Sequence, residues 1–393
     1  MTMAFEGIDL APLATELIAR ASADQADADA LMDLSTILQL QGIRDLGVTT
    51  QAHALQTKRL FGLQSRGAPG IRLLAIMAPG DLMTNTPLEF LIEDSDISLS
   101  MLYVLPDEPI PSELPAHDVL FVAVSQSDRT HALLDQLAAA APSWPKPVIN
   151  QPDRITNTSR TQAYQLLEGI PGLFMPVTAR ASRAELQRIS TAALPLRDVL
   201  CDGAFPLIVR PVDSHAGRSL AKVDAAEDLE PYLLATGGDE FFISRFVDYS
   251  SQDGLFRKYR IVFIDGVPHA GHMGVSEHWM IHYLNAGMAD SALKRAEEEA
   301  FMNGFEIDFA RRHADALRTV AERFALDYLV IDCGETGDGD LLMFEVCTGA
   351  VVHAMDPVDV FPYKRPHMNK VFAAFRSMLS RSMSPYGDGV PVV

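Results

Sequence analysis

The sequence is short of positive charge and has no long apolar run. Its 393 residues include 32 Lys and Arg against 52 Asp and Glu, which gives a formal net charge of -20. A nucleic-acid surface needs a basic stripe, and none is visible, so we expect no nucleic-acid partner. No apolar stretch approaches the roughly 20 residues of a membrane span, so we expect no membrane partner either.

Cysteine is also scarce. The three cysteines, Cys201, Cys333 and Cys347, show no paired spacing, which is typical of proteins in a reducing compartment. The first residues, Met-Thr-Met-Ala-Phe-Glu-Gly-Ile-Asp, lack a basic segment followed by an apolar core, so we expect no signal peptide. These features together predict a cytoplasmic protein.

The chain is too long for one comfortable core, and its pattern divides it into five parts. Residues 1–65 show helical periodicity only, which predicts a helical cap or a homodimerisation element. Residues 66–150 alternate strands with helices, which predicts a small parallel sheet. Residues 151–200 are interpreted as linker helices, and residues 201–250 and 251–393 as antiparallel α+β regions ending in a helix. The predicted fold class is therefore α/β and α+β.

Some elements are predicted in more detail. An apolar stripe from Leu46 to Leu60 indicates a third N-terminal helix, and residues 308–324 indicate one long helix. Ligands of parallel sheets bind beyond the carboxyl ends of the strands. Four residues that follow the strand at 71–77 are therefore candidates for a ligand site, although turn and helix-cap roles explain them equally: Gly80, Asp81, Asn85 and Thr86.

Two acidic residues stand in apolar runs near the end of the chain. Asp332 closes Tyr328-Leu-Val-Ile-Asp332, and Glu345 lies within Leu341-Leu-Met-Phe-Glu345-Val-Cys347. A carboxylate in such a run costs several kcal/mol unless it is paired or holds a cation. A hairpin with its turn at 333–340 would bring the two acids level, as a magnesium-nucleotide site requires. The alternative is that each acid is satisfied by a nearby arginine.

The histidines allow two interpretations. His278 and His282 are four residues apart and would offer zinc two ligands on a helix, but no third ligand is evident. Packing or substrate contact explains the same pair. His269, His272 and His353 are candidates for the wall of a second substrate pocket.

Several short motifs follow one another along the chain: Pro147-Val-Ile-Asn150, Thr158-Ser-Arg160, Leu166-Leu167, Pro206-Leu-Ile-Val-Arg210-Pro211, Tyr259-Arg260-Ile-Val and Glu345-X-Cys347. Taken in order, they resemble those of ATP-grasp enzymes, in the branch of glutathione synthetase and RimK-type carboxylate-amine ligases. The resemblance covers most of residues 70 to 360, and the order and spacing of the motifs carry it. It implies a pre-ATP-grasp domain at 66–150, a small lobe at 201–250 and a large lobe with a metal site at 251–393.

The resemblance implies ATP and Mg²⁺ (or Mn²⁺) as cofactors. Arg160 and Arg210 stand where the family has phosphate-contacting lysines, and the positive charge is kept. Gly217, in the loop 213–219, matches a flap that closes over phosphates. Surface arginines paired with acids, and a plain hairpin turn, are the alternatives for these positions.

The same resemblance implies an adenine site on a hinge strand. Ser244, Arg245 and Phe246 would meet the base, mainly through backbone groups, and Asp248 would meet the ribose hydroxyls. The family has Gln-Glu where this chain has Ser244-Arg245, so the choice between adenine and guanine stays open.

Arg260 matches the family's arginine that faces the γ-phosphate and the reacting carboxylate, where a fixed cation would stabilise developing charge. Asp332 and Glu345 match metal ligands. The third metal position, Asn in the family, is Cys347 here, and a thiol is a poor magnesium ligand. Either one metal site is weakened, or water or phosphate completes it, or catalysis is lost.

The resemblance implies an ATP-dependent ligase that joins a small-molecule carboxylate to an amine through an acyl phosphate and releases ADP and phosphate. An amino acid or short peptide is the expected substrate, since the acidic chain disfavours a polyanionic acceptor. Two alternatives remain: an ATP-grasp kinase that phosphorylates a hydroxyl, and a catalytically degenerate nucleotide-binding scaffold.

Overall fold

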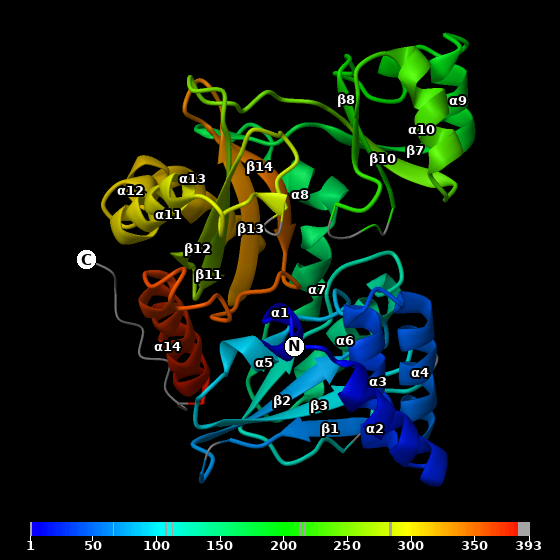
Figure 1. Ribbon diagram of the computed structural model, residues 1–393, viewed down its shortest axis with the longest axis vertical. Coiled ribbons are helices and arrows are strands. Elements are labelled where there is room, and N and C mark those ends of the chain that lie inside the picture. Colours follow the sequence, from blue (N-terminus) through cyan, green and yellow to red (C-terminus); the bar gives the residue numbers. More distant parts are fainter. Residues whose placement is uncertain are drawn as a thin grey trace.

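The computed structural model describes residues 2–65, 67–106, 108–111, 113–212, 214, 217–282 and 285–383. Its strands form three sheets, and helices precede the first of them (Figure 1). The expected mixed class, α/β and α+β with an N-terminal helical segment, is confirmed. No helix within the described residues is both long and apolar enough to span a membrane.

The first sheet is mainly parallel, with strand order β1-β3-β2-β4-β5. β2, β3, β4 and β5 run parallel, and β1 joins β3 as an antiparallel edge strand. The short helix α5 (Leu88–Leu91) and α6 (His131–Ala140) connect strands of this sheet. Its strands are β1 (Leu60–Leu63), β2 (Ile71–Met77), β3 (Ile97–Tyr103), β4 (Val119–Val122) and β5 (Val148–Ile149).

The strand β1 corrects two expectations. The third N-terminal helix ends at Thr57, because Lys58 adopts an extended backbone (φ -144°, ψ 136°). Leu60 therefore begins a strand rather than continuing a helix, and it pairs with Leu102 of β3. The division expected after residue 65 consequently cuts through the first sheet, whose edge strand lies before it.

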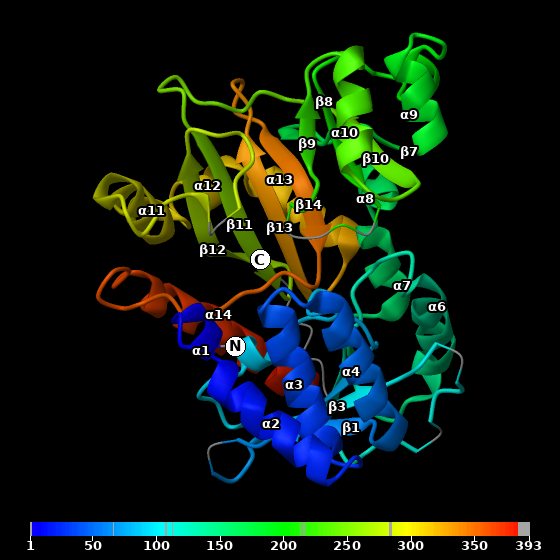
Figure 2. The same cartoon turned by 45° about the vertical axis from the view of Figure 1, so that its right-hand side comes forward.

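The N-terminal helices pack beside the first sheet (Figure 2). Their small core contains Leu10, Leu17 and Leu34, and α3 begins where the Asp27 side chain accepts a hydrogen bond from the Ala30 N–H at 2.9 Å. The helices are α1 (Thr2–Phe5), α2 (Ala11–Ala23), α3 (Ala28–Leu40) and α4 (Arg44–Thr57).

These helices also hold the loop after β2. Arg44 pairs with Asp81 at 2.7 Å, and the Gln51 side chain accepts a hydrogen bond from the Gly80 N–H at 2.8 Å. Asn85 bonds both main-chain groups of Ala78 at 2.8 Å. The polar groups of this loop are therefore used to join the sheet to the helices.

The second sheet is antiparallel, with strand order β7-β10-β8-β9 and a separate core. With α9 (Arg183–Ser190) and α10 (Leu229–Ala235) on one face it forms the small lobe, drawn in green in Figure 1. The lobe begins at β7, inside the segment expected to be a linker. Its strands are β7 (Thr178–Ser182), β8 (Leu207–Pro211), β9 (Ala221–Val223) and β10 (Glu240–Arg245).

The third sheet forms the large lobe, with strand order β12-β11-β13-β14-β6. The hairpin between β11 and β12 turns at Asp265 and Gly266, whose φ angles of 50° and 75° are those a two-residue turn requires. The strands are β6 (Leu173–Phe174), β11 (Phe256–Ile264), β12 (Val267–Ser276), β13 (Tyr328–Glu335) and β14 (Leu341–Cys347).

One helix of the large lobe differs from the expectation, because it is interrupted rather than continuous. The long helix expected at 308–324 is broken at His313, whose backbone leaves the helical region and whose Nε2 lies 2.8 Å from Glu335 Oε1. This tertiary contact explains the break. The helices are α11 (Ala292–Gly304), α12 (Phe309–Arg312), α13 (Ala314–Phe324) and α14 (Lys364–Ser382).

Buried contacts join the first and third sheets into one core. Phe375 of α14 packs against Phe121 of β4 and Tyr328 of β13, with ring centroids 6.0 and 5.9 Å apart. Asn150, which follows β5, donates from its side chain to the Tyr328 carbonyl at 2.9 Å and accepts from the Tyr328 N–H at 2.8 Å. The linker helices α7 (Pro152–Ile155) and α8 (Arg160–Leu167) start beside this junction.

Candidate active site

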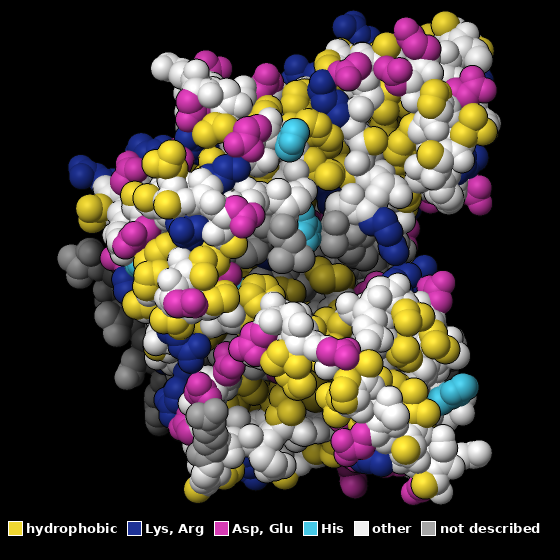
Figure 3. Space-filling view, in the orientation of Figure 1, with side chains coloured by type: hydrophobic (Ala, Val, Ile, Leu, Met, Phe, Trp, Pro, Cys, Tyr) yellow, Lys and Arg dark blue, Asp and Glu magenta, His cyan; other side chains and the backbone are white. Residues whose placement is uncertain are grey.

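A cavity of about 1500 Å³ lies between the second and third sheets, and the first domain (residues 60–150) closes one end. The space-filling view shows an indentation between the small lobe and the first domain, at the right of the picture (Figure 3). The described residues of its wall include six basic side chains against three acidic ones, although the whole chain carries a net charge of -20. They are Arg160, Arg180, Arg210, Arg245, Lys258 and Arg260, with Asp128, Asp332 and Glu345.

Arg210 is the basic side chain least compensated by the protein. It leaves β8 toward the cavity, and its guanidinium donates to the carbonyl and hydroxyl oxygens of Ser214. No carboxylate among the described residues forms an ion pair with it. Burial, followed by the neighbouring guanidinium of Arg160, lowers the pKa of Arg210 to about 9. A bound anion would relieve both effects.

Arg160 lies at the first residue of α8, after the helix cap Ser159. Its Nη1 donates to the Phe344 carbonyl at 3.2 Å, and its Nη2 lies 3.3 Å from Glu345 Oε1. Burial would raise the pKa of Glu345, but Arg160 and Arg210 lower it below its usual range. The two arginines and one carboxylate therefore share the β14 side of the cavity.

Asp332 and Glu345 are register partners on β13 and β14, so the hairpin brings them level. The Asp332 side chain is 6% exposed. The Arg260 guanidinium donates two hydrogen bonds to it, from Nε to Oδ1 at 2.8 Å and from Nη2 to Oδ2 at 2.9 Å. Lys258 Nζ lies 2.7 Å from the same Oδ2. Burial would raise the pKa of Asp332, but these two cations hold it well below its usual range.

Cys347 lines the cavity two residues after Glu345. Burial, followed by the charges of Glu345 and Asp332, raises its pKa to about 12, so the sulfur is a neutral thiol. Such a thiol is not a ligand for Mg²⁺, which prefers oxygen.

The three candidate ligands do not fit a divalent ion as they stand. Both oxygens of Asp332 accept from side-chain cations, Cys347 carries a thiol, and only Glu345 keeps an oxygen without a bond to a described residue. Within the described parts of the chain, no three His, Cys, Asp or Glu side chains are grouped so that they could hold a metal ion. The metal assignment therefore stays a prediction.

The hinge strand contributes side chains to the opposite wall. Ser244, Arg245 and Phe246 all line the cavity. The backbones of Ser244 and Arg245 pair with β8, and the Phe246 N–H donates to the Pro206 carbonyl at 2.9 Å, so part of the expected backbone contact surface is already used. The Phe246 ring packs edge-on against Trp279 with centroids 5.8 Å apart, which adds an aromatic surface to this end.

Gly217 and Asp248, the two remaining residues expected to contact the nucleotide, differ in whether they line the cavity. Gly217 lines the cavity with φ of 69°, the left-handed conformation expected of a flap glycine, while residues 213, 215 and 216 of the loop lie outside the described residues. Asp248 is exposed and does not line the cavity; its carboxylate accepts a hydrogen bond from the Ser250 N–H at 2.9 Å. The ribose role of Asp248 thus gains no support from its placement.

The loop after β2 and the candidate histidines each contribute only some of their residues to the cavity wall. Of the residues from 80 to 86, only Met83 reaches it, because Gly80, Asp81 and Asn85 bond the helices or their own loop. Of the five histidines singled out in the sequence, the wall contains His272, His282 and His353 but neither His269 nor His278. His353 packs against Phe5 of α1 with ring centroids 4.9 Å apart.

Sequence reasoning overlooked Lys258 and Arg180 as site residues. Lys258 precedes Arg260 by two positions on β11, and that spacing puts both side chains on one face of a strand, so the signal was available. Arg180 gave no such signal, because its partners come from distant segments.

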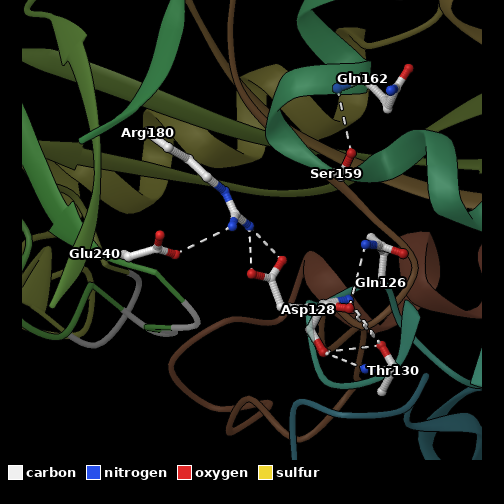
Figure 4. A network of polar contacts seen from close by, with 8 residues as sticks. Gln126, Asp128, Thr130, Ser159, Gln162, Arg180 and Glu240 are labelled. Atoms are coloured by element: carbon white, nitrogen blue, oxygen red, sulfur yellow. Dashed lines mark hydrogen bonds and ion pairs between the residues drawn. The ribbon is translucent and has the colours of Figure 1, made fainter. Parts of the chain in front are cut away.

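Arg180 bridges the small lobe and the first domain at the cavity wall (Figure 4). Its Nη2 lies 2.6 Å from Asp128 Oδ2, and its Nη1 lies 3.5 Å from Glu240. The loop that carries Asp128 is held by Thr130, whose hydroxyl donates to the Ser125 carbonyl at 2.6 Å. The bridge therefore links β7 to a loop with fixed geometry.

No protein-family model and no curated protein matches the chain. Among solved structures it is similar to D-alanine–D-alanine ligase from Bacillus anthracis complexed with ATP (13% identity, 81% of this chain and 100% of that chain, TM-score 0.48). It is also similar to VanG D-Ala:D-Ser ligase from Enterococcus faecalis (11%, 79% and 99%, TM-score 0.47). A third similar structure is a RimK domain protein ATP-grasp from Sphaerobacter thermophilus (13%, 78% and 99%, TM-score 0.43). Similarity at this level establishes neither a family nor an activity.

Proposed function

We propose that this chain is an ATP-dependent carboxylate-amine ligase of the ATP-grasp kind. The observation that carries the proposal is the pair Arg210 and Arg160, two guanidiniums that line one cavity, where Glu345 is the single carboxylate that pairs with either of them among the described residues. Buried like charges are costly unless an anion joins them. A nucleotide polyphosphate supplies that anion, and planar guanidiniums suit its oxygens.

The remaining wall is suited to the rest of ATP and to the reaction. Phe246 and Trp279 offer the base an aromatic surface at the hinge. Arg260 is held by Asp332 and also donates to the Val351 carbonyl at 2.9 Å, so its guanidinium has a fixed aim. A cation fixed in this way stabilises negative charge that develops during phosphoryl transfer without reorganising first.

The proposed reaction has two steps. A substrate carboxylate oxygen takes the γ-phosphoryl group of ATP, the bond to the β-phosphate oxygen breaks, and ADP leaves. The amine nitrogen then attacks the acyl carbon, an amide bond forms, and phosphate leaves with the bonding electron pair and takes up the proton that the nitrogen loses. The chain's part is to hold both substrates in place and to neutralise charge.

The substrates we propose are a small amino acid or short peptide for each partner. The test is ADP release across pairs of amino acids and dipeptides, with mass spectrometry of the products. We expect ADP together with a condensed product, a loss of at least about 100-fold in Arg210→Met, and unchanged rates in Arg188→Met, an exposed arginine outside the cavity. A phosphorylated hydroxyl product without condensation would instead identify a kinase.

A nucleotide-binding protein without catalysis is the second candidate. The observation that favours it is that both oxygens of Asp332 are occupied by Lys258 and Arg260. ATP binding without ADP release for every substrate pair would support this candidate.

A further inference from the structure

Lys258 and Arg260 converge on one carboxylate. They lie two positions apart on β11 and therefore point to the same face of the strand. Lys258 Nζ lies 2.7 Å from Asp332 Oδ2, and Arg260 contacts both Asp332 oxygens at 2.8 and 2.9 Å. All three side chains line the cavity. One negative charge thus holds two positive charges, which leaves this patch of the wall positive.

The arrangement leaves donors for a further anion. An ammonium has three N–H donors, and Asp332 is the partner found for Lys258 among the described residues. A guanidinium has five, of which two meet Asp332 and one meets the Val351 carbonyl. The Lys258 side chain is 21% exposed and the Arg260 side chain 19%, so both reach the cavity from a largely buried wall.

The same contacts disagree with a divalent ion at Asp332. A carboxylate has about four lone-pair positions, and three of those on Asp332 already accept from Lys258 and Arg260. Mg²⁺ demands near-ideal octahedral oxygen ligands, which this crowded carboxylate does not offer. Glu345, the other acid facing Asp332 across the hairpin, is turned to Arg160 at 3.3 Å.

We propose that Asp332 is a positioning residue that aims Lys258 and Arg260 at the phosphates of the bound nucleotide, and that the Lys258 ammonium supplies a positive charge in place of a divalent ion at Asp332. The proposal rests on the proposed function, since it takes the anion to be a nucleotide. Lys is a compact point charge with rotatable donors and is suited to this task.

The test is the affinity for ATP, measured by calorimetry in excess EDTA and in excess Mg²⁺. We expect the wild-type protein to bind ATP in EDTA and Lys258→Met to lose about 10- to 100-fold there, the value of a hydrogen bond to a charged group. The loss should be smaller in Mg²⁺, because Asp332 Oδ2 then keeps one donor, Arg260 Nη2, and has a lone-pair position open to the ion. Lys370→Met, at an exposed lysine outside the cavity, is the control and should bind as the wild type does.

Two further variants keep the test sharp if Lys258→Met folds poorly. Lys258→Arg retains the charge and should keep the affinity in EDTA within a few-fold. Asp332→Asn should weaken binding in EDTA, because both cations lose their fixed aim. Wild-type or tighter affinity in EDTA for Lys258→Met or Asp332→Asn would overturn the proposal.

The outcomes separate this proposal from the proposed function. A wild-type protein that binds ATP in Mg²⁺ but not in EDTA overturns the role of Lys258 and leaves the ligase standing. Binding in neither buffer overturns both.

Discussion

Arg260 and Asp332 stand opposite each other on the antiparallel strands β11 and β13, and their side chains form a two-point ion pair. Because Asp332 is buried, removal of Arg260 costs its carboxylate two hydrogen bonds and leaves Lys258 as its remaining cationic partner among the described residues. We predict that Arg260→Met lowers kcat for ADP formation by at least about 100-fold and the free energy of unfolding by about 2 kcal/mol.

Arg260→Lys separates the two effects. It keeps the charge but loses the planar fork, so stability should recover more than kcat does. Arg257→Lys is the matched control on the same strand, since Arg257 pairs with Asp253 and Glu297 outside the cavity. Full activity in Arg260→Met, measured beside thermal unfolding, would remove Arg260 from the site.

The Glu335 carboxylate, which contacts His313 at the break between α12 and α13, predicts that the stability of the protein depends on pH. Burial would raise the pKa of Glu335, but its hydrogen bonds with His313 and Arg312 hold it at about 2. The folded-state pKa lies below the ordinary value of 4.5, so the ionised carboxylate stabilises the protein above that value. This stabilisation, about 2 kcal/mol, is lost as the pH falls toward 2.

Glu335→Gln tests that dependence. The variant should be less stable than the wild type at pH 7, and the difference should shrink between pH 5 and pH 2 in urea unfolding experiments. Glu322→Gln, an exposed acid on α13, is the control. A wild-type–variant difference that stays constant across this range would contradict the assigned role of Glu335.

The ion pair between Arg180 and Asp128 should affect the separation of the small lobe from the first domain more than it affects the stability of the whole protein. Both side chains are about half exposed, and an exposed pair contributes about 1 kcal/mol or less. We predict that Asp128→Asn leaves the melting temperature within a few degrees but speeds hydrogen exchange in β7, because the small lobe loses a tie to the first domain. Arg318→Gln, which removes an exposed pair within α13, should leave exchange in β7 unchanged.

The cysteines should differ in reactivity. Cys201 is exposed, while burial raises the pKa of Cys333 and brings that of Cys347 to about 12. A thiol reagent at pH 8 should therefore label one cysteine in the native protein and all three after unfolding. Labelling of native Cys347, identified by peptide mass spectrometry, would show that its thiol is ionised.

Much of the fold follows from local patterns. The level placement of Asp332 and Glu345 was predicted because two apolar runs joined by a turn form a hairpin, and register follows from the turn. The turn at Asp265 and Gly266 has the residue types that favour a two-residue hairpin turn. The resemblance to ATP-grasp enzymes implied a site role for Arg210, and its side chain lines the cavity at the end of β8.

The errors have tertiary causes. The helix break at His313 depends on Glu335, which lies 22 residues away. The loop at Gly80 and Asp81 is turned from the cavity by Gln51 and Arg44, on helices whose role the sequence left open. Pairing of Asp332 with two cations depends on β11 lying beside β13, which periodicity does not reveal.

Trapping with hydroxylamine tests the central claim most directly. The protein, ATP and a panel of amino acids and dipeptides are incubated with hydroxylamine in place of the amine substrate, and the products are analysed by mass spectrometry. An acyl phosphate predicts a hydroxamate of one carboxylate together with an equal amount of ADP, both lost in Arg210→Met and retained in Arg188→Met. ADP without any hydroxamate, or hydroxamate formed equally well by Arg210→Met, would contradict the proposed ligase.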